Sequence, residues 1–259
     1  MRFYIRPPLE ESTKVYRYMT FSQFASLVEQ RKFYLTRVQK WEDTWETPSI
    51  AIPTKKQSGE LLYEKKFGEE RLYGSCWTKH HESDAMWRIY APQNDGVMIK
   101  TSVGKFGNLN FTNGYISEVY YYSSLNQGLE KTITDHDFLR PYSLGLLKRK
   151  AFEYEGEIRF LYYHNPMENL NELIEPNMIL LGDSDEKPDY IYSSFDPIDF
   201  IEGVTIDPRC DEWFAEMVML YCKRAGFRFK PKKSNLYSTD IYGETGLRFI
   251  ERTIFSYKK

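Results

Sequence analysis

The stretch VYRYMTFSQFASLVEQRKFYLT, residues 15–36, decides the fold class of this chain. Residues 15–19 have the composition of a short strand. Thr20 is a suitable N-cap for a helix over 21–31, because apolar residues recur there at helical spacing. Residues 32–36 again have the composition of a strand. The stretch therefore predicts a strand, a helix and a second strand joined by short turns.

Outside this stretch, similar signals recur as short, irregularly spaced segments. Further strands are expected over 72–78, 96–101, 115–122, 157–163, 177–181, 190–195 and 200–206. Helices are expected over 60–70, 85–90, 137–149 and 211–225. Short strands with few helices favour an α+β fold over a doubly wound sheet. No linker rich in Pro, Gly or Ser divides the chain, so residues 1–259 are expected to form a single domain.

Composition narrows the class of protein. The chain has 35 Lys and Arg against 37 Asp and Glu, a net charge of -2, whereas a duplex nucleic-acid binder is more often basic. Its three cysteines form no CxxC pair, which fits a reducing compartment. The N-terminus lacks the apolar segment of a signal peptide, and no apolar run is long enough to span a membrane. A cytoplasmic protein without a membrane partner is therefore expected.

Four polar side chains on or beside predicted strands suggest a site for chemistry on NAD at its glycosidic bond. Arg17 carries a fork of donors that suits a pyrophosphate or a ribose. The hydroxyls of Ser75 and Thr78 are suited to orienting the nicotinamide end. The carboxylate of Glu157 is suited to bonding the ribose 2′-OH and stabilising an oxocarbenium-like transition state. The alternative is that Arg17 and Glu157 form ordinary ion pairs.

Glu155 lies two residues before Glu157, with Gly156 between them. In an extended segment both carboxylates point to the same side of the chain. One is then expected to contact the ribose while the other activates an acceptor. Glu155 and Glu157 are therefore the candidate catalytic pair.

Tryptophans and acids concentrate over 41–46 and 75–90. Loops that hold Trp and acids often line sites, so Trp41 and Trp45 are candidate substrate contacts. Trp87 is a third candidate, although its position on a predicted helix also suits core packing. Neighbouring histidines at 80 and 81 do not have metal-ligand spacing, so no metal is expected. A less favoured alternative is a magnesium-dependent nuclease that uses Glu42, Asp43 and Glu46.

The segment 223–233 interleaves six cations with two aromatic residues. This pattern is compatible with contact to phosphates and bases. A solvated helix end followed by a strand explains the pattern more simply, because the helix dipole favours cations at a C-terminus. The basic run 148–150 has the same two interpretations.

Taken together, the sequence resembles a bacterial family described as domain of unknown function 2971, over roughly residues 14–237. The blocks that carry the resemblance are 15–19, 41–46, 75–78, 82–87, 96–100, 152–159 and 204–208, followed by a helix and Ser234-Asn235-Leu236. Related-looking proteins occur among abortive-infection and other phage-defence genes, which implies a role in defence.

The order of arginine, Ser-x-x-Thr and Glu-x-Glu is also similar to that of the ADP-ribosyltransferase superfamily. This second resemblance implies a mixed, mostly antiparallel sheet flanked by helices. It implies that Arg17 binds NAD, that Ser75 or Thr78 supplies the middle hydroxyl and that Glu157 is catalytic. Trp77 stands inside the hydroxyl motif, where it departs from that pattern.

The favoured hypothesis is an NAD-consuming, ADP-ribosyltransferase-like effector of phage defence. Tyr18 and Trp77 are expected to contact NAD beside Arg17, and the acceptor is expected to be a protein or a nucleic acid. The alternative is a non-catalytic module that binds nucleic acid or a partner protein of a defence system. Under that alternative, the basic segment 223–233 dominates binding, and affinity falls steeply with salt.

Overall fold

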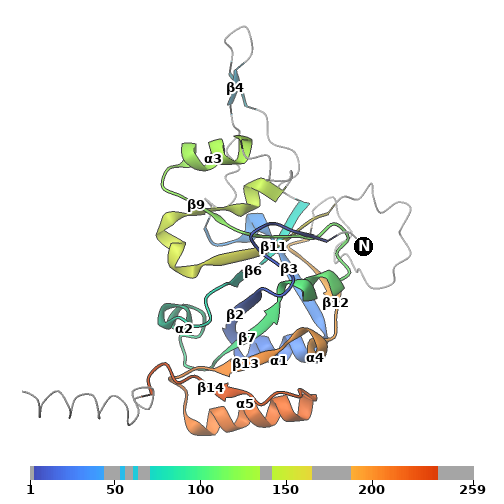
Figure 1. Cartoon of the computed structure of the whole chain (residues 1–259), viewed down its shortest axis with the longest axis vertical. Coiled ribbons are helices and arrows are strands. Elements are labelled where there is room, and N and C mark those ends of the chain that lie inside the picture. Colours follow the sequence, from blue (N-terminus) through green and yellow to red (C-terminus); the bar gives the residue numbers. More distant parts are fainter. Residues whose placement is uncertain are drawn as a thin grey trace, which may run out of the picture.

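The strand–helix–strand unit expected from residues 15–36 is present in the computed structural model (Figure 1). It consists of β2 (Lys14–Thr20), α1 (Phe21–Gln30) and β3 (Lys32–Arg37). Thr20 closes a capping box, since its side chain accepts from the Gln23 backbone while the Gln23 side chain accepts from the Thr20 backbone. The helix ends at Arg31 in a left-handed conformation, so β2 leads directly into α1 and α1 directly into β3.

The structure describes residues 3–43, 53–55, 61–63, 71–134, 142–164 and 188–238. The other strands are β1 (Tyr4–Ile5), β4 (Pro53–Lys55), β5 (Leu61–Tyr63), β6 (Leu72–Thr78), β7 (Gly96–Ser102), β8 (Tyr115–Glu118), β9 (Tyr120–Tyr122), β10 (Leu147–Arg149), β11 (Glu157–Tyr163), β12 (Tyr190–Ser194), β13 (Gly203–Ile206) and β14 (Lys232–Lys233). The other α-helices are α2 (Asp84–Tyr90), α3 (Leu125–Thr134), α4 (Pro197–Phe200) and α5 (Glu212–Ala225). None of the helices in these ranges is long and apolar enough to cross a membrane.

Ten of the described strands form a mixed sheet with the order β1-β8-β11-β6-β2-β7-β13-β14, and β3 and β12 branch from β6. The central neighbours β8, β11, β6, β2, β7 and β13 pair antiparallel. The short strands β1 and β14 pair parallel to their neighbours at the two edges. The expected α+β fold with a mixed, mostly antiparallel sheet is therefore confirmed.

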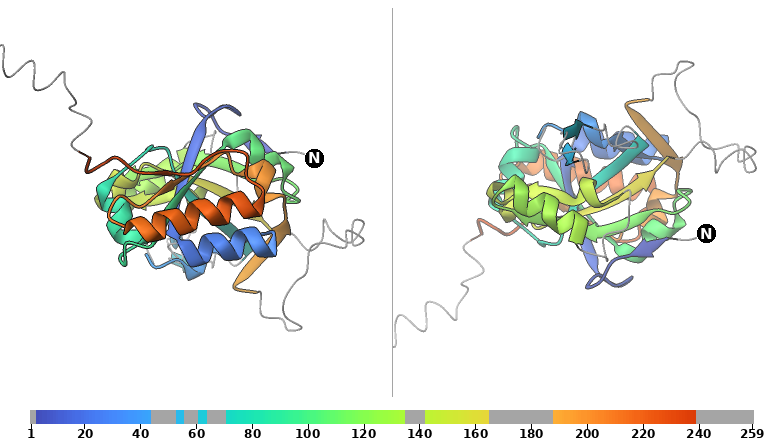
Figure 2. Two further views of the ribbon diagram at one scale, coloured as in Figure 1. Left: turned by 90° about the horizontal axis from the view of Figure 1, so that it is seen from below. Right: turned by 90° about the horizontal axis from the view of Figure 1, so that it is seen from above.

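Helices α1 and α5 lie side by side on one face of the sheet (Figure 2). Phe21 of α1 meets Phe214 of α5 with ring centroids 5.9 Å apart, and Phe24 meets Tyr221 at the same distance. Phe24 is fully buried. Burying a phenylalanine side chain contributes about 1.5–3 kcal/mol, so this contact is a substantial part of what holds α1 over the sheet.

The edge of β6 that faces β2 and β3 is shared between them. Thr78 pairs with Tyr16 of β2, while Gly74 and Tyr73 pair with β3. The stretch 75–77 between these pairings has no strand partner on that edge within the described residues. The sheet therefore opens over the middle of β6, and α1 bridges the opening because it connects β2 to β3.

Three sequence expectations are corrected. Residues 147–149 form β10 instead of the end of a helix, and 142–146 form a 3-10 helix. The expected strand over 115–122 is two strands, β8 and β9, which join different sheets. Leu61–Tyr63 is a strand, so these residues do not belong to the helix expected over 60–70, whose other positions lie outside the described residues. The strand expected over 177–181 lies outside the described residues.

Candidate functional site

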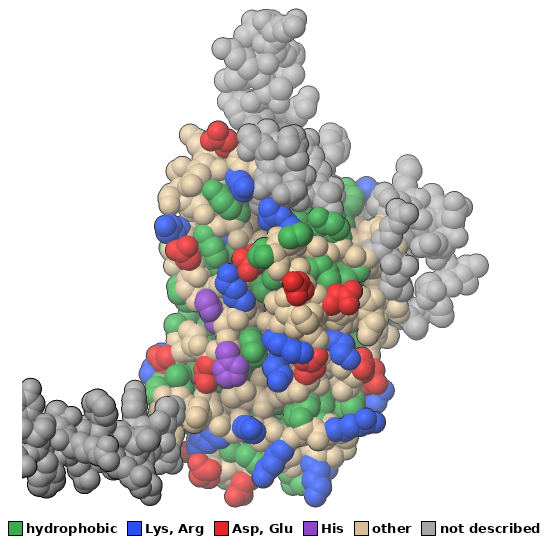
Figure 3. All heavy atoms as spheres, in the orientation of Figure 1, with side chains coloured by type: hydrophobic (Ala, Val, Ile, Leu, Met, Phe, Trp, Pro, Cys, Tyr) green, Lys and Arg blue, Asp and Glu red, His purple; other side chains and the backbone are tan. Residues whose placement is uncertain are grey.

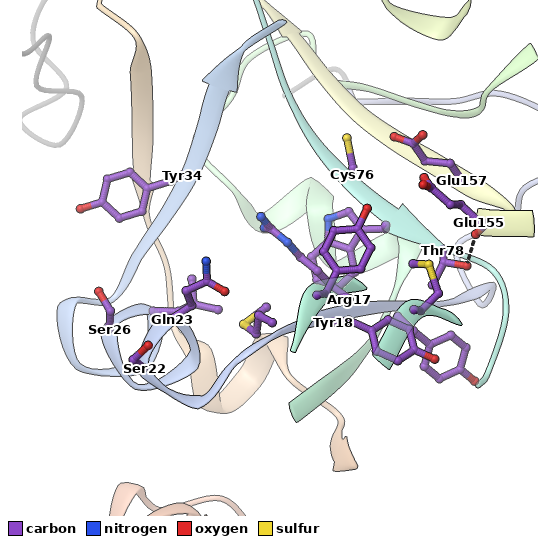
Figure 4. Close-up of a pocket in the computed structure, with 16 residues that line it drawn as sticks. Arg17, Tyr18, Ser22, Gln23, Ser26, Tyr34, Cys76, Thr78, Glu155 and Glu157 are labelled. Atoms are coloured by element: carbon purple, nitrogen blue, oxygen red, sulfur yellow. Dashed lines mark hydrogen bonds between the residues drawn. The ribbon is translucent and has the colours of Figure 1, made fainter. Parts of the chain in front are cut away.

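A cavity of about 560 Å³ lies where the sheet opens. Its lining comes from β2, α1, β3, β6 and α2, together with the two glutamates that precede and begin β11 (Figure 4). Among the candidates from the sequence, it brings together Arg17, Tyr18, Trp77, Thr78, Glu155 and Glu157. The order of strands explains this convergence, because β2, β6 and β11 are consecutive neighbours in the sheet.

Arg17 reaches across the opening of the sheet from β2 to β6. Its Nη1 donates to Ser75 Oγ at 3.1 Å, and its guanidinium lies 5.9 Å from the centre of the Trp77 ring. Trp77 Nε1 donates to the same Ser75 oxygen at 3.0 Å, which fixes the hydroxyl between them. Ser75 therefore orients Arg17, although it is not part of the cavity wall.

Arg17 is a partly buried cation in the wall of the cavity. Within the described ranges, no carboxylate lies close enough to form an ion pair with it. Burial lowers the pKa of its guanidinium, but an arginine keeps its proton in proteins. A partly desolvated guanidinium beside an open cavity is suited to an anionic ligand.

Glu157 is a buried carboxylate held by two cations. Arg159 contacts it in a bidentate manner, with Nε 2.8 Å from Oε1 and Nη2 3.1 Å from Oε2. Lys148 Nζ lies 2.5 Å from Oε2. Burial raises the pKa of the Glu157 carboxyl, but these cations outweigh burial and lower that pKa to about 2. Glu157 is therefore ionised over the whole range in which enzymes are assayed.

Glu155 meets Glu157 through Lys148, whose ammonium is also 2.5 Å from Glu155 Oε2. The sequence predicted that both carboxylates share one side, and the shared contact with Lys148 agrees. The physical reason differs from the expected one, because the segment is not extended. Glu155 ends a 3-10 helix and Gly156 follows with φ of 50°. Thr78 Oγ1 fixes this turn by donating to the Glu155 carbonyl at 2.5 Å (Figure 4).

Replacing Gly156 by alanine tests this turn. A Cβ at Gly156 would lie 2.3 Å from His80 Nε2, and the left-handed backbone disfavours any side chain. We expect a loss of about 1–2 kcal/mol for the backbone and a further loss for displacing His80. The matched control is Gly226→Ala, which has φ of 94° but no atom within 4 Å of its Cβ. Urea denaturation of both variants separates the cost of the left-handed backbone from the cost of displacing His80. Equal losses of unfolding free energy would show that the His80 contact costs nothing.

One end of the cavity is aromatic and lies beside the glutamates. It is lined by Tyr16, Tyr18, Met86 and Tyr90. Tyr18 is held there because its hydroxyl accepts from the Ser83 backbone at 2.9 Å and its ring packs on Trp87. The opposite end is polar and neutral, with Ser22, Gln23 and Ser26 of α1 and Tyr34 of β3 (Figure 4). Arg17 lies between the two ends.

Of the three tryptophans expected to contact substrate, the two that the structure describes lie elsewhere. Trp87 is fully buried, with Nε1 donating to Glu82, so it is a core residue and the expectation of a ligand contact is corrected. Trp41 does not line the cavity and instead packs its ring 4.3 Å from the Arg159 guanidinium. Trp45 lies outside the described residues.

The structure gives no support to the alternative of a magnesium site at Glu42, Asp43 and Glu46 among the residues that it describes. Within the described ranges, no group of three His, Cys, Asp or Glu side chains is arranged to hold a metal ion. Asp43 accepts from Arg149 at 2.9 Å, while Glu46 lies outside those ranges.

The basic segment 223–233 turns its aromatic residues inward. Phe227 is buried against Phe24, and Phe229 packs on Phe227 with ring centroids 5.0 Å apart. Lys233 is bound to Glu212. These aromatics are therefore not free to stack on bases. The face in Figure 3 also mixes basic with acidic side chains.

Glu155, Glu157, Lys148 and Arg159 form one charged cluster. Its two cations were not among the residues that the sequence predicted for the site. Arg159 follows Glu157 by two residues on one strand, so strand alternation alone places both on the same face. Lys148 gave no such signal, because it stood in an expected helix and a basic run. Its burial here, with 7% of its side chain exposed, corrects the interpretation of that run as a solvated or phosphate-binding surface at this position.

Comparison with known proteins finds one family model that matches part of the chain. Residues 86–160 match the family model described as "Protein of unknown function (DUF2971)", which confirms the resemblance over that segment. No curated protein matches the chain. The solved structures it is similar to include DarT of Thermus sp. 2.9 in complex with NAD+, at 12% identity and a TM-score of 0.37, covering 87% of this chain and 97% of that chain.

A second structure of the same Thermus protein, in complex with ADP-ribosylated ssDNA, is also similar. It has 12% identity and a TM-score of 0.33, and the match covers 88% of this chain and 96% of that chain. These likenesses concern the course of the backbone. The chemistry of this chain is therefore argued from its own side chains.

Proposed function

We propose that this protein binds NAD in the cavity over β6 and cleaves its nicotinamide–ribose bond, transferring ADP-ribose to an acceptor. One observation carries the proposal. An arginine without a carboxylate partner among the described residues and a buried ionised glutamate line the same cavity, on strands separated by β6 alone. The cavity has the volume of a small-molecule site, which is about 300–1,000 Å³ in proteins.

The proposed roles follow from charge and position. Arg17 binds the pyrophosphate, because its planar fork matches paired phosphate oxygens. The carboxylate of Glu157 stabilises the positive charge that develops on the ribose as the bond breaks. The electron pair of that bond leaves with the nicotinamide nitrogen and neutralises the ring. The acceptor then forms a bond to the same ribose carbon and gives up a proton, and Glu155 is placed to receive it.

The aromatic end of the cavity supports this orientation. Tyr18 lies on the side of Arg17 where the glutamates are, Met86 packs in one cluster with Tyr18, and Tyr90 interacts with both glutamates, so a flat ring that leaves from the reacting carbon has apolar surface to contact. The neutral polar end beside α1 then receives the adenosine half. Trp77 lies beside Arg17 but its ring is buried against Phe33 and Phe106, so it supports the cavity wall and the expected contact with NAD is corrected.

The direct test is purified protein incubated with NAD and scored for free nicotinamide by chromatography. Release by the wild-type protein supports the proposal. A complete absence of release, together with no detectable NAD binding by calorimetry, would overturn it. Adding candidate acceptors, single-stranded DNA oligonucleotides and a protein extract, then distinguishes transfer from hydrolysis.

Substituting Arg17 by alanine is expected to weaken NAD binding by about tenfold to a hundredfold, because charge-assisted hydrogen bonds contribute about 1.5–3 kcal/mol each. The dissociation constant is measured by calorimetry. Arg88→Ala is the matched control, since Arg88 is an exposed arginine paired with Asp84 on α2. Equal affinity in the Arg17 variant and the wild type would contradict the assigned role.

The resemblance seen in the sequence extends the proposal to phage defence. An enzyme that depletes the NAD of the host cell, or blocks its nucleic acid by modification, deprives a phage of what it needs to replicate. Expression of the wild-type protein is expected to lower plaque numbers for some members of a phage panel, while the inactive Glu157→Gln variant does not. Equal plaque numbers across the panel would remove the defence role and leave the chemistry untouched.

A further inference from the structure

Lys148 occupies an unusual position for a lysine. It lies on β10, paired with Tyr121 of β9, and only 7% of its side chain is exposed. Its ammonium lies 2.5 Å from one oxygen of Glu155 and 2.5 Å from one oxygen of Glu157. A lysine is seldom buried unless it is paired, and here a single ammonium is paired with two carboxylates.

We propose that Lys148 is a positioning residue that holds Glu155 and Glu157 together in their ionised forms, so that the pair is ready for reaction across a wide range of pH. This inference rests on the proposed function for its consequence in catalysis. The geometric basis is independent of it, since both contacts are made by the protein alone.

Among the residues that the structure describes, Lys148 is one of two cations that contact the pair. Lys148 and Arg159 supply two positive charges, and Glu155 and Glu157 supply two negative charges. Arg159 is bound in a bidentate manner to Glu157. The contact from Lys148 is therefore the one that also ties Glu155 to the cluster.

The other groups that face the pair do not replace this charge. They are the Cys76 thiol and the hydroxyls of Tyr90, Tyr121 and Tyr154. Burial raises the pKa of Tyr121 to about 12 and also raises the pKa of Tyr90 and Tyr154, so these hydroxyls stay neutral.

Removing the ammonium changes the protonation of the pair. Two buried carboxylates with one remaining cation repel each other, so one of them binds a proton at a pH where both were ionised. Lys148 lowers the pKa of the Glu157 carboxyl, so its removal moves that pKa upward. Activity that needs both carboxylates is then lost as the pH falls through a higher value than in the wild type.

The experiment compares Lys148→Met with Lys148→Arg and with Lys150→Met. Methionine keeps the length of the side chain and removes the charge, and arginine keeps the charge. Lys150 is an exposed neighbour whose loss removes the same charge from the surface. We expect the acid limb of nicotinamide release to move up by roughly one to three pH units in Lys148→Met. We also expect kcat at neutral pH to fall by about tenfold or more, with the KM for NAD little changed.

A second readout does not depend on activity. Carbon-13 NMR of the glutamate side-chain carboxyls, titrated in each variant, is expected to show one carboxyl protonating at higher pH in Lys148→Met. Lys148→Arg is expected to restore both the titration and much of the rate. An unchanged titration and pH profile in a folded Lys148→Met would overturn the inference, as would an equal effect of Lys150→Met. If the wild type releases no nicotinamide while the titration shifts as expected, the proposed function fails and the role of Lys148 in ionising the pair stands.

Discussion

Replacing Glu157 by glutamine is expected to lower the rate of nicotinamide release by about a hundredfold or more. The glutamine keeps the length and shape of the side chain but removes the negative charge that would face the developing cation on the ribose. Because that charge matters most in the transition state, the loss is expected in kcat, with a smaller change in the KM for NAD. Steady-state nicotinamide release measures both constants.

Stability has to be followed in the same variant, because Arg159 and Lys148 both bind Glu157. Melting temperature and circular dichroism show whether the folded population is comparable. The matched control is Glu153→Gln, an exposed glutamate in the 3-10 helix just before the site. A folded Glu157→Gln protein with full activity would exclude Glu157 from catalysis and favour a non-catalytic binding module.

Replacing Arg159 by methionine is expected to cost about 3–5 kcal/mol of unfolding free energy. The Arg159 side chain is fully buried, with Nε and Nη2 on Glu157 and Nη1 donating to the Gly145 carbonyl at 2.7 Å. Without it, Lys148 is the cation left among the described contacts for two buried carboxylates, Glu155 and Glu157, and a buried charge that is only partly paired is expensive. Urea denaturation at neutral pH measures the loss as a lower midpoint.

Arg149→Met is the comparison for this prediction. The Arg149 side chain is 43% exposed and its ion pair with Asp43 is partly solvated, so its loss is expected to cost less than about 1 kcal/mol. If the two variants lose the same stability, burial is not what makes the Arg159 contact strong. Nicotinamide release by any folded Arg159→Met protein is expected to fall as well, because Glu157 loses its bidentate partner.

Most of the local structure was predictable from the sequence, and the reasons are local. The unit from β2 to β3 has a capping residue, an apolar face at helical spacing and flanking strands, so its elements formed where they were expected. The prediction of a helix over 137–149 was wrong for residues 147–149. Their apolar positions suit a helix, whereas their pairing with β9 imposes a strand. The prediction that Trp87 contacts substrate was wrong. A tryptophan suits a ligand contact as well as a core, and only the packing shows that Trp87 lies against Tyr18 and Met86.

The sequence by itself determined the α+β class and a set of candidate polar residues on three predicted strands, because composition and periodicity are properties of short segments. Only the tertiary structure decided that β2, β6 and β11 are neighbours, which brings Arg17 and Glu157 into one cavity. It also decided that Lys148 is buried between two carboxylates instead of lying on a basic surface. Strand order and burial arise from contacts between segments far apart in the chain, and no local pattern encodes those contacts.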